Sequence, residues 1–503
     1  MCGIFATTGH ISDELMKNVL QSMEHRGPDE GKDHMLDHFH LGHQRLSIIG
    51  LHDGIQPIAN ADQSKWIVCN GEIYNYPQLK KELQQKTTFL TESDSEVALK
   101  IYEEEGLNGV TRLDGMFAYF IANETDNTFF AVRDTLGIKP LYYGRDEQGH
   151  YVFASELKTI YEVVETAHEF PAGHYFTPET GFVCYRSINS PDVSSILTET
   201  PMEDITTQIH HHLTNAVDKR LLADVEVGVL LSGGLDSSLI AALAKKLHKE
   251  KHPLKSFCVG SEGSEDLKRA RDVAEAIGTE HYEYVYTKEE LLEIIPTVIY
   301  YLESFEPSLV RSALPNYFVS KLAAQHVKVI LSGEGADELF AGYDYLKDFT
   351  KTKTLNDEII RIINTLHNVN LQRADRMSMA HSLELRVPFL DLKLIDYALK
   401  VPAELKLHSD QRMEKWLLRK SFEGMLPEHV LWRKKEEFSE GSGALDILEI
   451  HANNAISEEE MNRLNKLAPV NLRSKQEAMY YRIFKEHFPQ ESALETVGRW
   501  ATT

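Results

Sequence analysis

The sequence predicts two domains of different class: an α+β domain of stacked antiparallel sheets flanked by helices, then an α/β domain on a parallel sheet with a helical C-terminal part. At 503 residues the chain is too long for one hydrophobic core. Up to about residue 185, aromatic and β-branched residues gather in short segments between turns, a pattern typical of antiparallel sheets. Beyond residue 204, strand patterns alternate with helical patterns, which favours a parallel sheet with right-handed crossovers.

The first domain is expected to span residues 1–186. Its strand patterns are short and rich in aromatic and β-branched residues, and they lie at 65–75, 115–124, 127–134 and 150–156. Helical patterns interrupt them at 13–25 and 93–106.

The segment that follows, residues 187–203, is polar and contains two prolines, so we expect it to be the linker between the domains. The second domain, residues 204–503, opens with apolar residues that recur every four positions from Ile205 to Leu221, as in an amphipathic helix. Strands are expected at 225–231, 254–260, 281–287 and 327–333, and the pattern is mainly helical from about residue 355. Binding sites in parallel sheets lie at the carboxyl ends of the strands.

Charge and cysteine usage exclude several classes of function. A formal net charge of −24, from 77 acidic and 53 basic residues, argues against general affinity for nucleic acid or for anionic membranes. The four cysteines form no CxxC pair, and the N-terminus has no basic leader before an apolar run. We expect a cytoplasmic protein, with a homodimer possible. The histidines at 34–43 and 210–212 are expected to be solvated rather than metal ligands.

The strongest local signal is an apolar strand that breaks into Ser232-Gly233-Gly234 with a helix directly behind it. Adjacent glycines let the backbone approach a ligand, and the helix N-terminus directs free N–H groups at the same point. Ser232, Ser237 and Ser238 add hydroxyl groups, and Asp236 can hold a metal ion that bridges phosphate oxygens. The spacing differs from that of a Walker A loop. The simpler alternative is an N-cap serine with a pair of turn glycines.

Cys2 is a candidate nucleophile. Removal of Met1 would give it a free α-amino group with a pKa of about 8, which can take the thiol proton without a histidine partner. The alternative is a buried structural cysteine, which we consider weak at position 2 because chain termini are seldom buried.

Five motifs, MCGIF, HRGPD, HQRLSII, CNGEIYN and SDSE, resemble in this order those of N-terminal-nucleophile (Ntn) glutamine amidotransferases. The resemblance implies an Ntn-hydrolase fold with Cys2 as nucleophile and an oxyanion hole formed by Asn70 and Gly71. Arg45 would hold the α-carboxylate of glutamine and Asp94 its α-ammonium. The remaining implied glutamine contacts are Leu46, Ser47, Ile48, Ile49 and Glu72.

The loop at Ser232 resembles the SGGxDS pyrophosphate loop of enzymes that adenylate a substrate. With FCVG, LSGEGADELFAGY, ELRVPFLD, RMEKWLLRKSFE and WRKKEEFSEG, the second half resembles asparagine synthetases. The resemblance implies that Glu334 lies beside an acyl-adenylate and that Asp236 and Asp337 serve Mg²⁺. The implied contacts to ATP and pyrophosphate are Leu231, Ser232, Gly233, Gly234, Asp236, Ser237, Val259, Arg311, Ser332, Gly333 and Lys435.

One segment departs from the family pattern. Typical asparagine synthetases have two threonines shortly before the arginine that corresponds to Arg311, whereas this chain has Ser308 and Leu309. Ordinary structural explanations stay open for some of the residues above: Asp337 and Glu338 as an acidic first turn of a helix, and the basic run 433–435 as a solvated face.

The resemblance implies a glutamine-hydrolysing asparagine synthetase that uses glutamine, aspartate and ATP with Mg²⁺. Ammonia released at Cys2 would cross to a β-aspartyl adenylate. Three alternatives stay open: a related ligase with another carboxylate acceptor, a catalytically silent regulatory relative and a nucleotide-sensing module.

Overall fold

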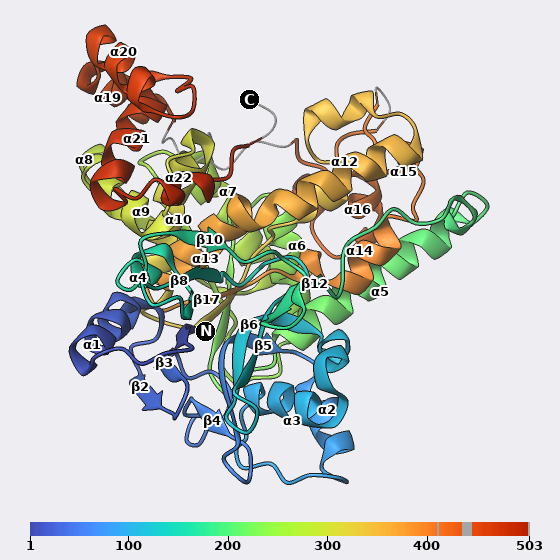
Figure 1. Ribbon diagram of the computed structural model, residues 1–503. Helices are drawn as coiled ribbons and strands as arrows, with labels where there is room; N and C mark the ends of the chain where they lie inside the picture. Colours follow the sequence, from blue (N-terminus) through green and yellow to red (C-terminus); the bar gives the residue numbers. More distant parts are fainter. Residues whose placement is uncertain (410–411, 435–444, 501–503) are drawn as a thin grey trace.

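A computed structural model describes residues 1–409, 412–434 and 445–500. Two antiparallel sheets occupy the first part of the chain and a parallel sheet lies in the second, which confirms the predicted fold class (Figure 1). In the first sheet the strand order is β10-β8-β9-β1-β3-β2, with β10 (Ala167–Glu169), β8 (Tyr142–Arg145), β9 (Tyr151–Ala154), β1 (Cys2–Thr7), β3 (His40–Arg45) and β2 (Glu30–Met35).

The second antiparallel sheet has the order β12-β11-β7-β6-β5-β4. Its strands are β12 (Gly181–Cys184), β11 (His174–Thr177), β7 (Thr128–Arg133), β6 (Gly115–Asn123), β5 (Lys65–Ile73) and β4 (Ile58–Ala59). An aromatic and aliphatic core fills the space between the two sheets and includes Ile4, Leu41, Phe120 and Phe153. The sheets are therefore stacked face to face, as predicted from the sequence.

Helices cover the outer faces of this pair of sheets. α1 (Asp13–Ser22) and α4 (Leu157–Ile160) pack on the first sheet, and α3 (Ser95–Glu105), with α2 (Tyr76–Leu83) beside it, packs on the second. The two predicted helices are therefore present, and α2 and α4 are additions to the prediction. Residues 187–201 contain only the short 3-10 turn Val193–Ser195.

The parallel sheet has the order β15-β14-β13-β16-β17. Its strands are β15 (Glu280–Val285), β14 (Lys255–Gly260), β13 (Val227–Leu230), β16 (Val329–Leu331) and β17 (Glu384–Arg386). The strand β17 lies in a region where the sequence predicted helices, and its three residues are too few to show a strand pattern. Helices α5 (Met202–Arg220), α6 (Leu235–Leu247), α7 (Glu265–Ile277) and α10 (Pro307–Ala323) pack on or beside this sheet.

Helices make up most of the remaining described chain, in agreement with the predicted helical C-terminal part. They are α8 (Lys288–Glu293), α9 (Ile295–Leu302), α11 (Ala336–Leu339), α12 (Thr352–Thr365), α13 (Asn370–Met379), α14 (Leu392–Ala398), α15 (Ala403–Lys406), α16 (Trp416–Ser421), α17 (Glu428–Leu431), α19 (Leu445–Ala455), α20 (Glu458–Leu467), α21 (Lys475–His487) and α22 (Ser492–Glu495). No helix of the described residues is long and apolar enough to cross a membrane.

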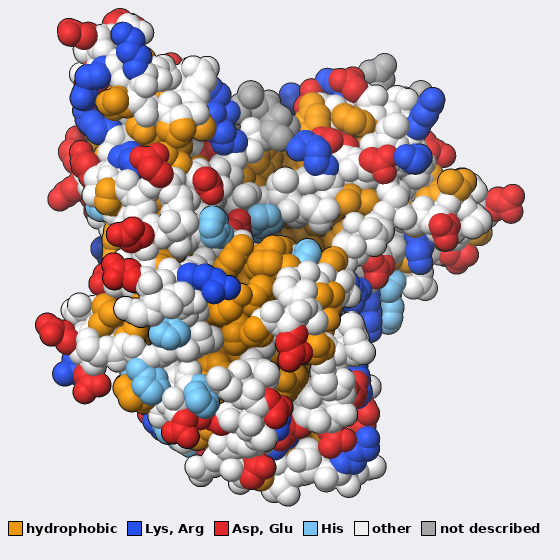
Figure 2. Space-filling view, in the orientation of Figure 1, with side chains coloured by type: hydrophobic (Ala, Val, Ile, Leu, Met, Phe, Trp, Pro, Cys, Tyr) orange, Lys and Arg blue, Asp and Glu red, His pale blue; other side chains and the backbone are white. Residues whose placement is uncertain are grey.

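The surface carries interspersed charges of both signs on the face in Figure 2, with hydrophobic side chains gathered near its middle, where Figure 1 places β6 and β12. Two histidines correct the expectation that the cluster at 34–43 is solvated. His40 and His43 are buried, because they lie on β3 in the interior of the first sheet. Burial lowers the pKa of His43 to about 3, so its ring is neutral at physiological pH.

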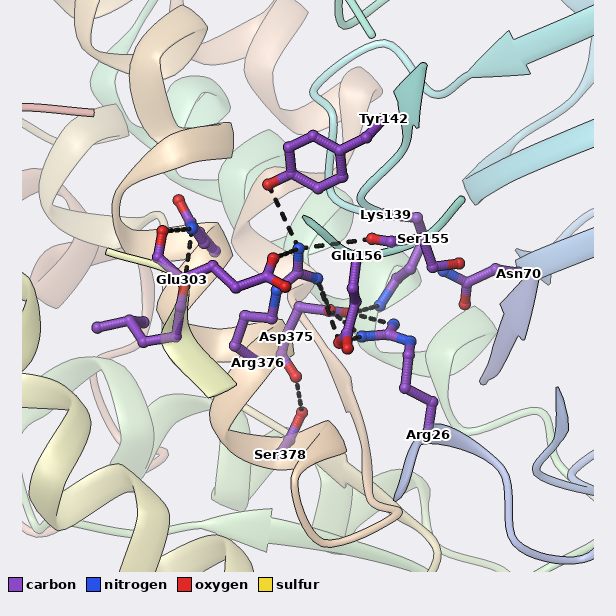
Figure 3. A network of polar contacts seen from close by, with 12 residues as sticks. Arg26, Asn70, Lys139, Tyr142, Ser155, Glu156, Glu303, Asp375, Arg376 and Ser378 are labelled. Carbon is purple, nitrogen blue, oxygen red and sulfur yellow. Dashed lines mark hydrogen bonds and ion pairs between the residues drawn. The ribbon is translucent and has the colours of Figure 1, made fainter. Parts of the chain in front are cut away.

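A buried ionic network joins the two halves of the molecule (Figure 3). Arg26, from the first half, contacts Glu156 at 2.7 Å and Asp375 of α13 at 2.9 Å. Arg376 of α13 contacts Glu303 at 2.9 Å. Because each of these side chains is at most 3% exposed, their charges are stabilised by one another rather than by water.

Candidate active sites

The N-terminus is buried, contrary to our expectation for a chain terminus. Met1 and Cys2 are 1% and 7% exposed, because β1 lies inside the first sheet and the α-amino group of Met1 pairs with Glu384 of β17 at 3.0 Å. Burial raises the pKa of the Cys2 thiol. Burial therefore disfavours the thiolate, and a base close to the sulfur is needed to activate it.

Asn70 lies directly beside Cys2. The backbone N–H of Cys2 donates a hydrogen bond to Asn70 Oδ1 at 3.1 Å. The Nδ2 group of Asn70 is buried, and no hydrogen-bond partner for it is found in the described part of the chain. An unpaired buried donor is costly, so Nδ2 is available for an acceptor on a bound ligand. Gly71 follows with φ 152°, and a Cβ there would lie 2.1 Å from the Met116 carbonyl oxygen, so the position requires glycine.

Two buried carboxylates complete this region. Asp94, just before α3, accepts a hydrogen bond from the Ile73 N–H at 2.8 Å, and burial raises its pKa to about 6. Glu72 lies 3.4 Å from Arg386 of β17. Burial raises the pKa of Glu72 well above its ordinary value, and the neighbouring Glu384 raises it further.

Arg45 ends β3, and its guanidinium donates to the Gly50 carbonyl at 2.6 Å. The loop that wraps this side chain contains the other predicted glutamine contacts. Leu46, Ile48 and Ile49 are buried, and the N–H of Ser47 donates to Asp29 at 2.8 Å. The predicted glutamine residues thus come from β1, β3 with its following loop, β5 and the start of α3.

The phosphate loop joins β13 to α6, as predicted. Gly233 has φ 74°, and a Cβ there would lie 2.5 Å from the backbone of Arg269, so only glycine fits. Ser232 and Ser237 are within 3.1 Å of each other through their hydroxyl groups. Ser238 differs from our expectation: its side chain is buried and donates to the Gly234 carbonyl at 2.6 Å, because it lies on the inner face of α6.

A pocket of about 780 Å³ opens at the carboxyl ends of the parallel strands. Its volume lies in the usual range for small-molecule sites. Its lining includes every residue of the predicted nucleotide and metal site that the structure describes: Leu231, Ser232, Gly233, Gly234, Asp236, Ser237, Val259, Arg311, Ser332, Gly333, Glu334 and Asp337. Lys435 lies outside the described residues.

Charged groups in this pocket are held by specific partners. Asp236 and Asp337 both contact the ammonium group of Lys415, at 2.5 Å and 2.8 Å. Glu334 pairs with Arg373 of α13. Burial opposes the charged form of Lys415, but the two aspartates outweigh it and raise the pKa of the lysine.

The segment 305–311, whose sequence departs from the family pattern, forms part of the same pocket. Arg311 donates to Ser308 Oγ at 2.9 Å and to Gln476 Oε1 at 2.9 Å. Leu309 is 3% exposed, and its N–H is capped by Glu306 at the start of α10. The remaining hydroxyl therefore orients the arginine, whereas the leucine packs into the hydrophobic core.

Sequence reasoning assigned no role to Lys415, Arg373, Arg269, Tyr343 or Trp500, which also line this pocket. Lys415 is part of the motif RMEKWLLRKSFE, but a lysine beside a tryptophan gives no local signal of its partners. Arg373 lies on α13, whose sequence reads as an ordinary amphipathic helix. These contacts depend on the tertiary fold.

Comparisons with known proteins identify the families of both halves of the chain. Residues 1–183 match the model of the glutamine amidotransferase domain family, and residues 208–356 and 347–501 match that of the asparagine synthase family. A probable glutamine-hydrolysing asparagine synthetase of Dictyostelium discoideum is 38% identical over 540 residues, covering 100% of this chain and 96% of that protein. Glutamine-hydrolysing asparagine synthetase 3 of Arabidopsis thaliana is 38% identical over 520 residues, covering 99% and 89%, respectively.

Proposed function

The chain belongs to the family of glutamine-hydrolysing asparagine synthetases, and we propose that it forms asparagine from aspartate, glutamine and ATP at the two sites described above. One observation carries the proposal. Residues from separate segments of the second half, including the phosphate loop, Val259, Arg311 and the segment 332–337, line one pocket. This pocket lies where parallel sheets bind their ligands.

In the first site, Cys2 is the nucleophile once Met1 is removed. The nitrogen of Cys2 then becomes the free α-amino group beside Asn70 and takes the thiol proton. The sulfur attacks the carboxamide carbon of glutamine, ammonia leaves, and water hydrolyses the thioester to glutamate. The free Nδ2 of Asn70 and the N–H of Gly71 stabilise the oxyanion.

Arg45 and Asp94 hold the two ends of the glutamine backbone in this proposal. A guanidinium matches a carboxylate with two hydrogen bonds, and the carboxylate of Asp94 pairs with an ammonium group. Glu72 and the loop 46–49 line the same site. The carboxyl group of Asp94 can pair with the ammonium group only when it is ionised. Because Asp94 is buried, its ionisation is disfavoured.

In the second site, a carboxylate oxygen of aspartate attacks the α-phosphorus of ATP, pyrophosphate leaves, and ammonia then displaces AMP from the β-aspartyl adenylate. The phosphate loop binds the leaving pyrophosphate through backbone N–H groups and the hydroxyls of Ser232 and Ser237. Arg311 and Lys435 neutralise phosphate charge, while Leu231, Val259, Ser332 and Gly333 contact the nucleotide. Glu334, held by Arg373, faces the adenylate.

Asp236 and Asp337 fit a magnesium ion. Their carboxylate oxygens converge on one point that already carries a positive charge, and Mg²⁺ prefers oxygen ligands shared between protein and phosphates. When bound, Mg²⁺ supplies positive charge that orients and neutralises the phosphate oxygens.

The test is pyrophosphate release by the purified protein with glutamine, ATP and aspartate, with the amino-acid products identified. We expect aspartate-dependent pyrophosphate and equal amounts of asparagine and AMP. A panel of other carboxylates, including peptides and β-amino acids, serves as the control. Pyrophosphate release with one of these and none with aspartate would show that the acceptor is a different carboxylate.

A further inference from the structure

The ammonium group of Lys415 occupies the position between the two aspartates to which we assign Mg²⁺. It lies 2.5 Å from Asp236 and 2.8 Å from Asp337, and the lysine side chain is only 3% exposed. The two aspartates come from different elements, since Asp236 lies in the first turn of α6 and Asp337 lies in α11. Lys415 thus bridges two carboxylates that would otherwise repel each other.

Two features of the backbone allow Lys415 to reach the two aspartates. Lys415 adopts the left-handed conformation, with φ 54° and ψ 29°, which costs free energy in a residue with a side chain. Gly342 provides the room: a Cβ there would lie 2.1 Å from Asp337 Oδ1 and 2.3 Å from Cε of Lys415. The pair therefore depends on a strained residue and on a glycine, neither of which an incidental surface ion pair requires.

The charges of the site determine when a divalent cation can enter. With the lysine in place, a dication at the same oxygens meets a positive charge at close range in a buried site, where Coulomb repulsion is strong. A polyphosphate removes this repulsion, since its oxygens bring negative charge for both cations. We propose that Lys415 holds the place of the metal in the nucleotide-free protein, so that a divalent cation binds Asp236 and Asp337 only together with a polyphosphate. This inference rests on the metal role of the two aspartates in the proposed function.

The test measures Mn²⁺ binding to the full chain without nucleotide, by the loss of the electron paramagnetic resonance signal of free Mn²⁺. Lys415→Met removes the competing charge, and we expect it to bind one Mn²⁺ at least about tenfold more tightly than the unmodified protein. Lys415→Arg, which keeps the charge, should behave like the unmodified protein. Lys434→Met is the matched control, because Lys434 lines the same pocket but is exposed. The double variant Lys415→Met with Asp337→Asn should lose the gain.

A purely structural role for Lys415 gives different results. Equal Mn²⁺ affinity of the unmodified protein and Lys415→Met would overturn the proposal. If Lys415→Met does not fold, the unmodified protein still decides: Mn²⁺ alone should leave its thermal midpoint unchanged, whereas Mn²⁺ with inorganic pyrophosphate should raise it. An equal rise with Mn²⁺ alone contradicts the place-holding role. If neither addition raises the thermal midpoint, the two aspartates do not bind the metal. That result contradicts the proposed function itself and is distinct from a failure of the place-holding role.

Discussion

The two candidate sites solve opposite electrostatic problems. The glutamine site is buried around Cys2 and Asn70, and its ligand-facing donor, the amide of Asn70, is neutral. The nucleotide site is an open pocket in which two aspartates share the positive charge of Lys415. A nucleophilic thiol and free ammonia require protection from water, whereas a triphosphate requires charged side chains that can change partners when it binds. The first site therefore needs burial and neutral donors, and the second needs access and paired charges.

One helix, α13, contributes to the surroundings of both sites. Arg373 contacts Glu334 in the nucleotide pocket, and Asp375 and Arg376, two and three residues later, lie in the ionic network beside Asn70 (Figure 3). Successive positions of a helix point to different sides, so one rigid element can hold groups at two sites at once. A packed helix rather than a loop thus links the surroundings of the two sites.

The comparison predicts that the two activities can be separated, and the largest effect is expected at Cys2. Cys2→Ala should lower glutamine-dependent synthesis by about a thousandfold or more, because the thioester cannot form. Synthesis with ammonium chloride should stay within about twofold, since the nucleotide pocket is unchanged. Pyrophosphate release with each nitrogen source measures both. Equal loss of the two activities would mean that the sites are not independent.

The reverse separation is expected at Asp236. Asp236→Ala should reduce pyrophosphate release by about a hundredfold or more, because the metal loses one of its carboxylates. Glutaminase activity, measured as glutamate formation, should persist. Asp344→Ala is a matched control, because Asp344 lines the same pocket but pairs with Lys347 at 2.6 Å. Undiminished pyrophosphate release by Asp236→Ala would refute its role.

The network between the sites is expected to govern stability. Arg376→Met removes the 2.9 Å partner of Glu303, which keeps only Lys158 at 2.8 Å, and it removes one partner of Asp375, so we expect a loss of about 3 kcal/mol. Arg361→Met removes the pair between the exposed Arg361 and the half-buried Glu358 and should cost about 1 kcal/mol or less. Thermal unfolding of both variants provides the measurement. A midpoint for Arg376→Met close to that of Arg361→Met would show that the network contributes little.

The sequence predicts the fold class and most strands because their signals are local. Segments rich in aromatic and β-branched residues define β5 and β6, and a strand that breaks into glycines defines the phosphate loop. The sequence does not predict β17, because the three residues of this edge strand form a strand only by pairing with β16. It does not predict the burial of Met1 either, since this burial depends on Glu384, which lies almost four hundred residues along the chain.

Site residues divide in the same way. Resemblance of motifs indicated Cys2, Asn70 and Asp236. The structure places Asn70 beside Cys2, and Asp236 in the lining of the second pocket. The same motifs assigned no role to Lys415, although its sequence position was within one of them. Its contacts with two aspartates from separate helices depend on the approach of chain segments, which periodicity does not record.

A pH dependence distinguishes the glutamine site further. The pKa of Asp94 is about 6, raised by burial, so the carboxylate is charged above this pH and neutral below it. Because the proposed contact with the glutamine ammonium requires the charged form, kcat/KM for glutamine should fall up to about tenfold per pH unit below pH 6. Asp94→Asn should have a low kcat/KM for glutamine that does not fall further below pH 6. If kcat/KM of Asp94→Asn falls with the same midpoint, the fall belongs to another titrating group.

The smallest effect is expected where the sequence departs from its family. Ser308→Thr adds one methyl group beside the hydroxyl that accepts from Arg311, and it keeps that hydrogen bond. If Arg311 binds phosphate, the change should alter the KM for ATP by about twofold to threefold and leave the KM for aspartate unchanged, because a methyl group is worth about 1 kcal/mol or less. Leu309→Thr, by contrast, places a hydroxyl at a buried position between the pocket and the core, and it should lower the thermal midpoint more than it changes the KM for ATP. Steady-state kinetics in both substrates, together with thermal unfolding, separate the two changes. A shift of Ser308→Thr confined to aspartate would place this wall of the pocket at the acceptor rather than at the phosphates.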